Sequence, residues 1–144
     1  DLHSFPTRRS SDLWQTDILP FCLRHGIGVI VYSPMLSGML TGAMTRERAM
    51  NLPRDDWRST NKEFREPRLS RNLELVELLR EIGRKRGRSV SEVAVAWTLR
   101  HPAVTGAIVG GRSAEQVTDT IGAMEFRLGD EEARQIETFV SAMS

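Results

Sequence analysis

The fold class is decided by the stretch GVIVYSP, residues 28–34. Its centre is β-branched and aromatic, and Gly28 and Pro34 bound it, as is typical of a strand. The later stretch TGAIVG, residues 105–110, has the same character. Runs that are apolar throughout are typical of parallel strands covered by helices on both faces. The two stretches therefore predict buried parallel strands of an α/β protein.

Helical patterns flank these two stretches. Ser89 with Glu92, and Ser113 with Gln116, have the spacing of capping boxes, which mark the starts of helices. Asp130 opens a stretch whose first residues are acidic, as the dipole at a helix start favours. We expect helices over 16–25, over 72–86, from Ser89 to the His101–Pro102 pair, from Ser113 to about Ala123, and from Asp130 onwards. The shared apolar face of the first would carry Ile18, Leu19, Cys22 and Leu23.

The composition is that of a globular protein: 40% of the 144 residues are hydrophobic, 27% are charged, and the formal net charge is +1. This balance gives no reason to expect a nucleic acid or an anionic membrane as partner. The basic run GRKRGR, residues 83–88, could be a nucleic-acid signal, but it also fits a helix end, where cations suit the dipole. No apolar run approaches the roughly 20 residues of a membrane-spanning helix. A single cysteine, Cys22, fits a reducing compartment, so we expect a cytoplasmic protein.

Two parallel strands make a very small sheet, because sheets usually carry about four to six strands. We therefore expect the chain to be a fragment of a larger α/β domain. Residues 1–13, DLHSFPTRRSSDL, fit no helix, strand or signal peptide. One interpretation is a disordered basic tail. The other is that this stretch, whose back-translation resembles a widely used sequencing-adapter oligonucleotide, is not native and that the protein's own sequence begins near Trp14.

The chain resembles the aldo-keto reductase family in several blocks. These are LPFCLRHGIGVIVYSPMLSGMLTG (19–42), EVAVAWTLRHPAVTGAIVGGRSAEQVTDTIGA (92–123) and the acidic start of the last helix. The resemblance covers essentially all of residues 16–140 and implies the C-terminal part of a (β/α)8 TIM barrel, with the barrel incomplete. The first strand described above would be the seventh of that barrel and the second would be the eighth. Residues 14–144 would then form its NADP(H)-binding half.

The residues after each strand have the chemistry of a phosphate site. In barrels of this type, sites lie at the C-terminal ends of strands, often with phosphate held after strands seven and eight. Gly38 lets a ligand approach the backbone closely, and Arg112 adds a planar charged fork just before a helix start. The alternative is that both segments are ordinary strand-to-helix turns with capping serines and a solvated Arg112. The resemblance to the family favours the interpretation that these segments bind a phosphate-bearing ligand.

The resemblance implies a role for each residue of this site. Tyr32 would stack on the nicotinamide ring. The pyrophosphate would be lined by Ser33, Pro34, Met35, Leu36 and Ser37. Gly110 and Arg112 would hold the adenosine 2′-phosphate, with Gln116, Asp119 and Thr120 near the adenine, so NADP(H) is expected rather than NAD(H). The departures from the family are Thr120 for the usual Asn, Ala43 for a frequent Lys, and Val109 for a frequent Pro.

The resemblance also implies what the chain lacks. In the family, hydride passes between NADPH and an aldehyde or ketone, and a Tyr acid works with a Lys, an Asp and a His. No residue among 14–144 matches any of these, Tyr32 included. The histidines fail as well: His25 and His101 stand at helix ends, and His3 lies in the adapter-like stretch.

These expectations leave three functional classes open. The first is a fragment, inactive alone, of an NADP(H)-dependent aldo-keto reductase that acts on small carbonyl substrates. The second is a part of a non-catalytic, cofactor-sensing subunit of the same fold, like the β subunits of potassium channels. The third is an unrelated α/β protein whose turns bind phosphate. The sequence indicates neither the substrate nor the oligomeric state.

The polar stretch 41–70 is too long for an ordinary connection, and connections of such length are often lids. The resemblance implies that it covers the cofactor and helps to shape the substrate pocket, with Trp57, Arg58 and Phe64 as candidate contacts. The alternative is that Trp57 and Phe64 only anchor the stretch to the barrel.

Overall fold

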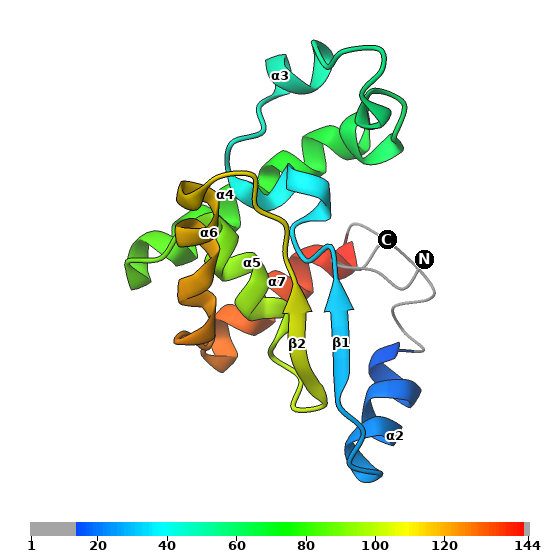
Figure 1. The fold of residues 1–144 in the computed structure, drawn as a ribbon, viewed down its shortest axis with the longest axis vertical. Coiled ribbons are helices and arrows are strands. Elements are labelled where there is room, and N and C mark those ends of the chain that lie inside the picture. The colour runs from blue at the N-terminus through cyan, green and yellow to red at the C-terminus, as the bar shows by residue number, and fades with distance from the viewer. Residues whose placement is uncertain (1–13, 143–144) are drawn as a thin grey trace.

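The structure is a computed structural model that describes residues 14–142. The interpretation of residues 1–13 as adapter-derived lies outside these residues. Two strands lie side by side at the front of the molecule in Figure 1, β1 (Val29–Tyr32) and β2 (Val104–Ile108), and they pair in parallel. Two predicted strands are thus confirmed, although β2 ends two residues early and leaves Val109 and Gly110 in the following connection.

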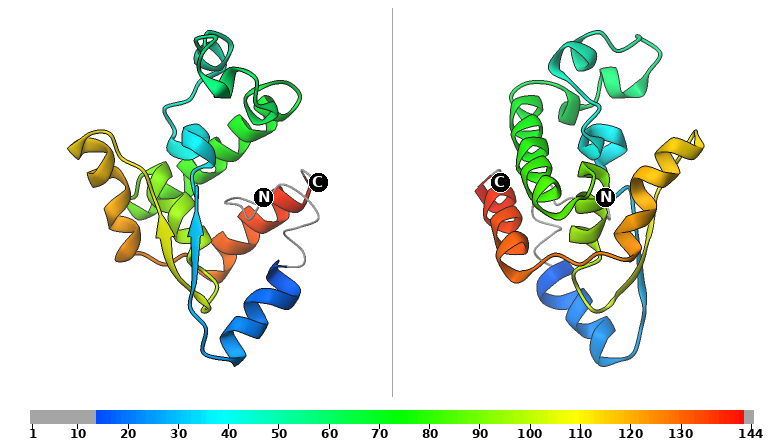
Figure 2. Two further views of the ribbon diagram at one scale, coloured as in Figure 1. Left: turned by 45° about the vertical axis from the view of Figure 1, so that its right-hand side comes forward. Right: turned by 90° about the vertical axis from the view of Figure 1, so that its left-hand side faces the viewer.

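Helices cover only one face of this two-stranded sheet. The helices α4 (Arg68–Arg86), α5 (Val90–Thr98) and α7 (Asp130–Ala142) lie behind the strands in Figure 1 and to one side of them in the right-hand view of Figure 2. The prediction that both faces are buried is therefore wrong for the described residues. Ile30 is 65% exposed and Ile108 is 61% exposed, because no described element packs on their side of the sheet.

The core lies mainly among α4, α5, α7 and the turn Leu36–Thr41, and the sheet packs against its side. α5 is buried continuously from Val90 to Trp97, as expected for a helix that is mostly apolar, and its polar residues Ser91 and Glu92 are buried with it. α4 and α7 instead present one apolar stripe each and keep their charged faces in water. The most deeply buried side chains include Met39, Leu40, Leu69, Leu79, Ile82, Val93, Trp97 and Ile136.

The signals for helix starts are confirmed by the hydrogen bonds. The Ser89 hydroxyl accepts from the backbone N–H of Glu92, and the Glu92 carboxylate accepts from the backbone N–H of Ser89, so both halves of the capping box form. Ser113 caps α6 (Ala114–Ile121) through the N–H of Gln116. The first turn of α7 is acidic, as predicted.

Two expectations about helices need correction. The first helical region is a π-helical turn, Trp14–Ile18, that continues into α2 (Leu19–Arg24), but Leu23 is 48% exposed, so the expected shared face buries only Cys22 well. α5 ends at Thr98 rather than at the His101–Pro102 pair. Just after the helix, the backbone N–H of Arg100 donates to the carbonyl of Trp97 three residues earlier, a tighter bond than in an α-helix. The α-helix therefore ends about one turn before the proline.

The stretch 41–70 is not an open loop. It contains α3 (Arg46–Met50) and two short 3-10 turns, Trp57–Ser59 and Lys62–Phe64, and it forms the upper part of the molecule in Figure 1. Glu63 fastens it to α4, because this buried carboxylate pairs with Arg68 and the Glu63 carbonyl accepts from the side chain of Asn72 at 2.9 Å. No helix within residues 14–142 has the length and apolar character needed to cross a membrane.

Candidate functional site

The candidate site lies at the edge of the sheet where both strands end. Tyr32 pairs with Ile108 in the parallel register, so the connections that follow the two strands leave from the same edge (Figure 1). The first connection comprises residues 33–42, and the second comprises residues 109–113. The predicted site residues at the two strand ends are therefore brought together.

The connection after β1 has an unusual backbone. Ser33, Leu36 and Ser37 all have positive φ values, of 54°, 47° and 54°, although they are not glycines. Such values are uncommon and concentrate at functional sites and tight turns. Pro34 and Met35 are buried and anchor the turn, whereas Ser33 and Ser37 are exposed. The turn thus directs two serines outward at the end of β1.

The connection after β2 leads directly into a helix start. Gly110 and Arg112 are exposed, and a side chain on Gly110 would meet nothing within 4 Å. The backbone N–H of Arg112 donates to Oε1 of Gln116 at 2.8 Å, which holds the Gln116 side chain against the connection. The first N–H groups of α6 have no acceptor within the helix, so this end favours an anion.

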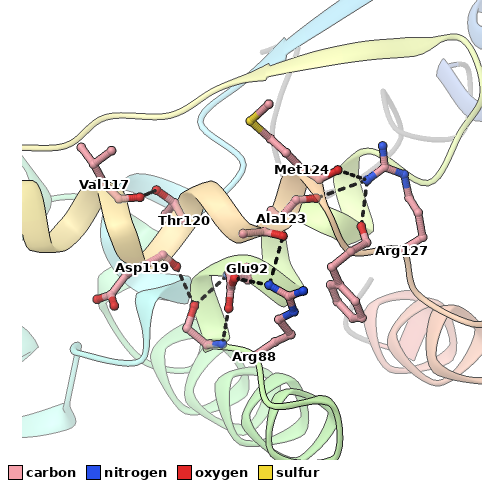
Figure 3. Close-up of polar contacts among 11 residues, drawn as sticks. Arg88, Glu92, Val117, Asp119, Thr120, Ala123, Met124 and Arg127 are labelled. Carbon is pink, nitrogen blue, oxygen red and sulfur yellow. Dashed lines mark hydrogen bonds and ion pairs between the residues drawn. The ribbon is translucent and has the colours of Figure 1, made fainter.

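α6 is held in place through its far end (Figure 3). The Ser89 hydroxyl donates to the carbonyl of Asp119 at 2.6 Å, and the Arg88 side chain reaches the carbonyl of Gly122 at 3.4 Å. The carboxylate of Asp119 itself points away from α5. Thr120 is buried, and its hydroxyl donates to two carbonyls of its own helix, those of Gln116 and Val117, both at 3.0 Å. Thr120 is therefore oriented into the fold, while Gln116 and Asp119 are exposed.

The segment above the site brings in a pair that our reading of the sequence missed. Asp56 and Arg58 form an ion pair at 2.6 Å, and Nη1 of Arg58 lies 3.8 Å from the place where a Cβ on Gly38 would stand. Arg58 was a predicted contact; Asp56 was not. The Asp-x-Arg spacing at the start of a short helical turn is the signal that could have indicated it, since Asp is a preferred N-cap.

The two aromatic candidates of this segment behave differently. Phe64 is 3% exposed and belongs to the core, so it anchors the stretch 41–70 to the rest of the fold. Trp57 is 57% exposed, which leaves it accessible to a ligand or to solvent. Arg58 lies over the ring of Phe64, with its Cζ 5.9 Å from the ring centroid.

The described histidines do not form a catalytic group. His25 ends α2 with its ring 4.2 Å from that of Phe21. Nδ1 of His101 accepts from the backbone N–H of Ala103, and burial, followed by the charge of Arg100, lowers the pKa of His101. Among residues 14–142, no cluster of histidine, cysteine or carboxylate side chains could hold a metal ion.

The site has the features that a phosphate-bearing cofactor needs. Two exposed serines, a glycine with open space, the start of an eight-residue helix and the arginines Arg58 and Arg112 lie around one sheet edge. Backbone N–H groups and planar guanidinium groups are the donors that phosphates favour. The residues present therefore offer donors of the kind that phosphate groups accept from.

A model described as the aldo/keto reductase family matches residues 6–141, a range that begins inside the stretch 1–13. A putative voltage-gated potassium channel subunit beta of Schizosaccharomyces pombe is 31% identical over 120 residues, which is 80% of this chain and 34% of that protein. An uncharacterised oxidoreductase of Bacillus subtilis, YrpG, is 29% identical over 122 residues, 85% of this chain and 35% of that protein.

Two further similarities agree with these. An NADH-specific methylglyoxal reductase of Escherichia coli is 25% identical over 129 residues, 90% of this chain and 38% of that protein. The structure of a glycerol dehydrogenase from Gluconobacter oxydans superposes with a TM-score of 0.80 at 30% identity, over 94% of this chain and 39% of that one. The chain thus spans 34–38% of the length of these curated relatives and aligns with part of a TIM barrel.

These matches exclude the alternative of an unrelated α/β protein. They cover nearly all of the described chain, and they agree with the two parallel strands and with the helices around them. The chain belongs to the aldo/keto reductase family.

Proposed function

We propose that this chain forms the NADP(H)-binding part of an aldo/keto reductase that transfers hydride between NADPH and an aldehyde or ketone. The observation that supports this proposal best is the parallel pairing of Tyr32 with Ile108. It places both strand ends, with Ser37 and Arg112 beyond them, at one edge of the sheet. A ligand with several phosphates can therefore contact both connections at once.

Each predicted residue has a proposed role that its position allows. Tyr32, partly exposed at the end of β1, stacks on the nicotinamide, and the turn formed by Ser33, Pro34, Met35, Leu36 and Ser37 lines the pyrophosphate. Gly110 and Arg112 hold the 2′-phosphate. Gln116 and Asp119 contact the adenine from the exposed side of α6, and Thr120 supports that end from inside the fold.

The cofactor, when bound, supplies the hydride. The part of the chemistry that falls to this chain is binding and orientation: the two connections fix the phosphates, and Trp57 and Arg58 lie in the segment above them. No residue of 14–144 matches the Tyr, Lys, Asp and His that handle the proton in this family. We therefore expect cofactor binding by this chain without turnover.

The experiment is a titration of the chain with NADPH and with NADH, followed by the tryptophan fluorescence of the chain, to which the exposed Trp57 contributes. We expect NADPH to bind more tightly, because Arg112 offers two charged donors to the extra phosphate. Arg112→Gln should weaken NADPH binding about tenfold to a hundredfold, in line with a charged hydrogen bond of about 1.5–3 kcal/mol, and should leave NADH binding nearly unchanged. Arg134→Gln, an exposed arginine on α7, is the control with the same charge change.

Equal affinity of the chain for NADPH and NADH would contradict the role of Arg112 in selecting the phosphate. Absence of binding by either nucleotide would contradict the proposed function itself.

A non-catalytic cofactor sensor is the second candidate function. It is favoured by the 31% identity to the putative potassium channel subunit beta. Both candidates predict NADPH binding by this chain, so binding cannot separate them. Sequencing of the source DNA upstream of the codon for Trp14 separates the two candidates. A reductase has to encode the Asp, Tyr, Lys and His at strand ends, whereas a sensor can lack them.

A further inference from the structure

The segment above the site contains a carboxylate that holds one arginine through three donors. Oδ1 of Asp56 accepts from the backbone N–H of Arg58 at 3.0 Å and from Nε at 3.0 Å, while Oδ2 accepts from Nη2 at 2.6 Å. The two side chains are largely covered, with 19% of Asp56 and 22% of Arg58 exposed. A bidentate pair of this kind fixes the plane of the guanidinium as well as its position.

The remaining nitrogen of Arg58 is directed at the turn after β1. Nη1 lies 3.8 Å from the Cβ position of Gly38, and within residues 14–142 no hydrogen bond from Nη1 is recorded. The ring of Phe64 covers one face of the guanidinium, with 5.9 Å between Cζ and the ring centroid. Asp56 at one edge and Phe64 at one face therefore leave Nη1 as the donor that faces the glycine turn.

The electrostatic environment of Asp56 also includes a residue of the second connection, Arg112. Hydrogen bonds from the Arg58 side chain and then from its backbone N–H lower the pKa of Asp56 to about 2, and the charge of Arg112 contributes to the same shift. Arg112 stands just before α6, whereas Arg58 belongs to the segment between β1 and α4. One carboxylate thus lies in the field of two arginines that belong to different segments of the chain.

We propose that Asp56 is a positioning residue for the cofactor phosphates: it keeps Arg58 oriented with Nη1 toward Gly38 before the ligand arrives. This inference rests on the proposed function, since it assumes that the phosphates lie over the turn after β1. Orienting a flexible arginine in advance strengthens binding, because the cost of ordering its side chain no longer falls on the binding step. The negative charge of Asp56 alone has the opposite effect, because it repels a phosphate.

These opposite effects make Asp56→Asn a decisive variant. Asn keeps the N-cap acceptor for the backbone N–H of Arg58, but it removes the charge and one of the two oxygens that grip the guanidinium. We expect NADPH affinity to fall about threefold to tenfold, the range of roughly one good hydrogen bond, while the thermal midpoint of the ligand-free chain stays close to that of the wild type. Unchanged or tighter binding overturns the proposal, as does a loss of affinity that only follows a loss of stability.

Asp55→Asn is the matched control. It removes the same charge one residue earlier, and within residues 14–142 the Asp55 side chain forms no hydrogen bond or ion pair. Arg58→Lys is the second test, because it keeps the charge and loses the planar fork. We expect Arg58→Lys to match Asp56→Asn, and the double variant to be no weaker than either single one. Additive losses overturn the inference that Asp56 acts through Arg58.

A measurement without cofactor separates the failure of this inference from the failure of the proposed function. Titration of the Asp56 carboxyl carbon by NMR should give a pKa near 2 in the wild type and a higher pKa in Arg58→Lys, which loses the guanidinium fork but keeps the backbone N–H and the positive charge. A wild-type value near 3.8 overturns the positioning role, whatever the chain binds. A low pKa together with no NADPH binding leaves the Asp56–Arg58 pair in place and rejects the cofactor site.

Discussion

Ser89 and Asp119 are joined by a hydrogen bond of 2.6 Å from the Ser89 hydroxyl to the Asp119 carbonyl. The same hydroxyl accepts from the N–H of Glu92 and so caps α5. One small side chain therefore caps the start of α5 and also binds α6, the helix that follows β2. The position of the second connection consequently depends on a residue outside the site.

Ser89→Ala is expected to destabilise the chain by about 1–2 kcal/mol, since it removes an N-cap and a second hydrogen bond. Ser89→Gly should separate the two effects, because Gly replaces Ser at an N-cap at a cost of only a few tenths of a kcal/mol. Urea denaturation followed by circular dichroism measures both variants, with Ser141→Ala on the exposed end of α7 as control. If Ser89→Ala unfolds at the same urea concentration as the control, neither the N-cap nor the hydrogen bond to Asp119 contributes to the stability of the chain.

Gly83 of α4 lies very close to the turn that leads to α5. A Cβ on Gly83 would lie 2.4 Å from the backbone carbonyl oxygen of Arg88, and backbone cannot rotate away as a side chain does. Gly83→Ala should therefore cost about 1–3 kcal/mol, the usual range for an overpacked core. Glu74→Ala, exposed on the same helix, should stay within about 0.5 kcal/mol of the wild type. A stable Gly83→Ala variant would mean that the two helices pack less closely than described.

Glu132 links the stability of the chain to pH. Hydrogen bonds from Arg86, at 2.7 and 3.1 Å, are the main cause that lowers the pKa of Glu132 below its usual 4.5, and the N–H of Gly129 adds to them. The unfolded chain then binds this proton more readily than the folded chain, so the pair stabilises the fold above about pH 4.5 and this contribution is lost as the pH falls.

The corresponding variant is Glu132→Gln. Its urea midpoint should lie below that of the wild type at pH 6, and the two midpoints should converge at pH 3. Glu131→Gln makes the same charge change in the same helical turn, where Glu131 pairs with the exposed Arg134. A pH dependence that is equal in wild type and Glu132→Gln would show that this pair does not carry the effect.

The uncovered face of the sheet should make the chain associate with itself. Ile30, Tyr32 and Ile108 are exposed there, and soluble domains rarely leave such apolar surface in contact with water. Ile30→Lys should shift the chain toward monomer in sedimentation velocity runs at several concentrations. Gln135→Lys adds the same charge on α7 and should not do so. A wild-type chain that is monomeric at all concentrations would contradict this prediction.

Local signals account for what the sequence predicted well. The capping box of Ser89 and Glu92 and the glycine at position 87, which ends α4 with a φ of 64°, depend on neighbouring residues only, so they can be read along the chain. Burial could not be read in this way. Ile30 has the same apolar neighbours whether or not something covers it, and Trp57 and Phe64 occur in one irregular stretch although one is exposed and the other buried. The ion pair between Asp56 and Arg58 depends on a short turn, which the periodicity of apolar residues does not reveal.

The register of β1 and β2 has a thermodynamic consequence. The two connections at the site are far apart in the sequence and lie together only because Tyr32 is aligned with Ile108. A ligand that touches both connections can bind only to molecules in which the strands are paired. Its binding free energy then adds to the free energy of unfolding, by about 2.7 kcal/mol when its concentration is 100 times its Kd. The midpoint of thermal unfolding therefore reports how much of the site is occupied by the ligand. The fraction of molecules with paired strands then rises with the ligand concentration.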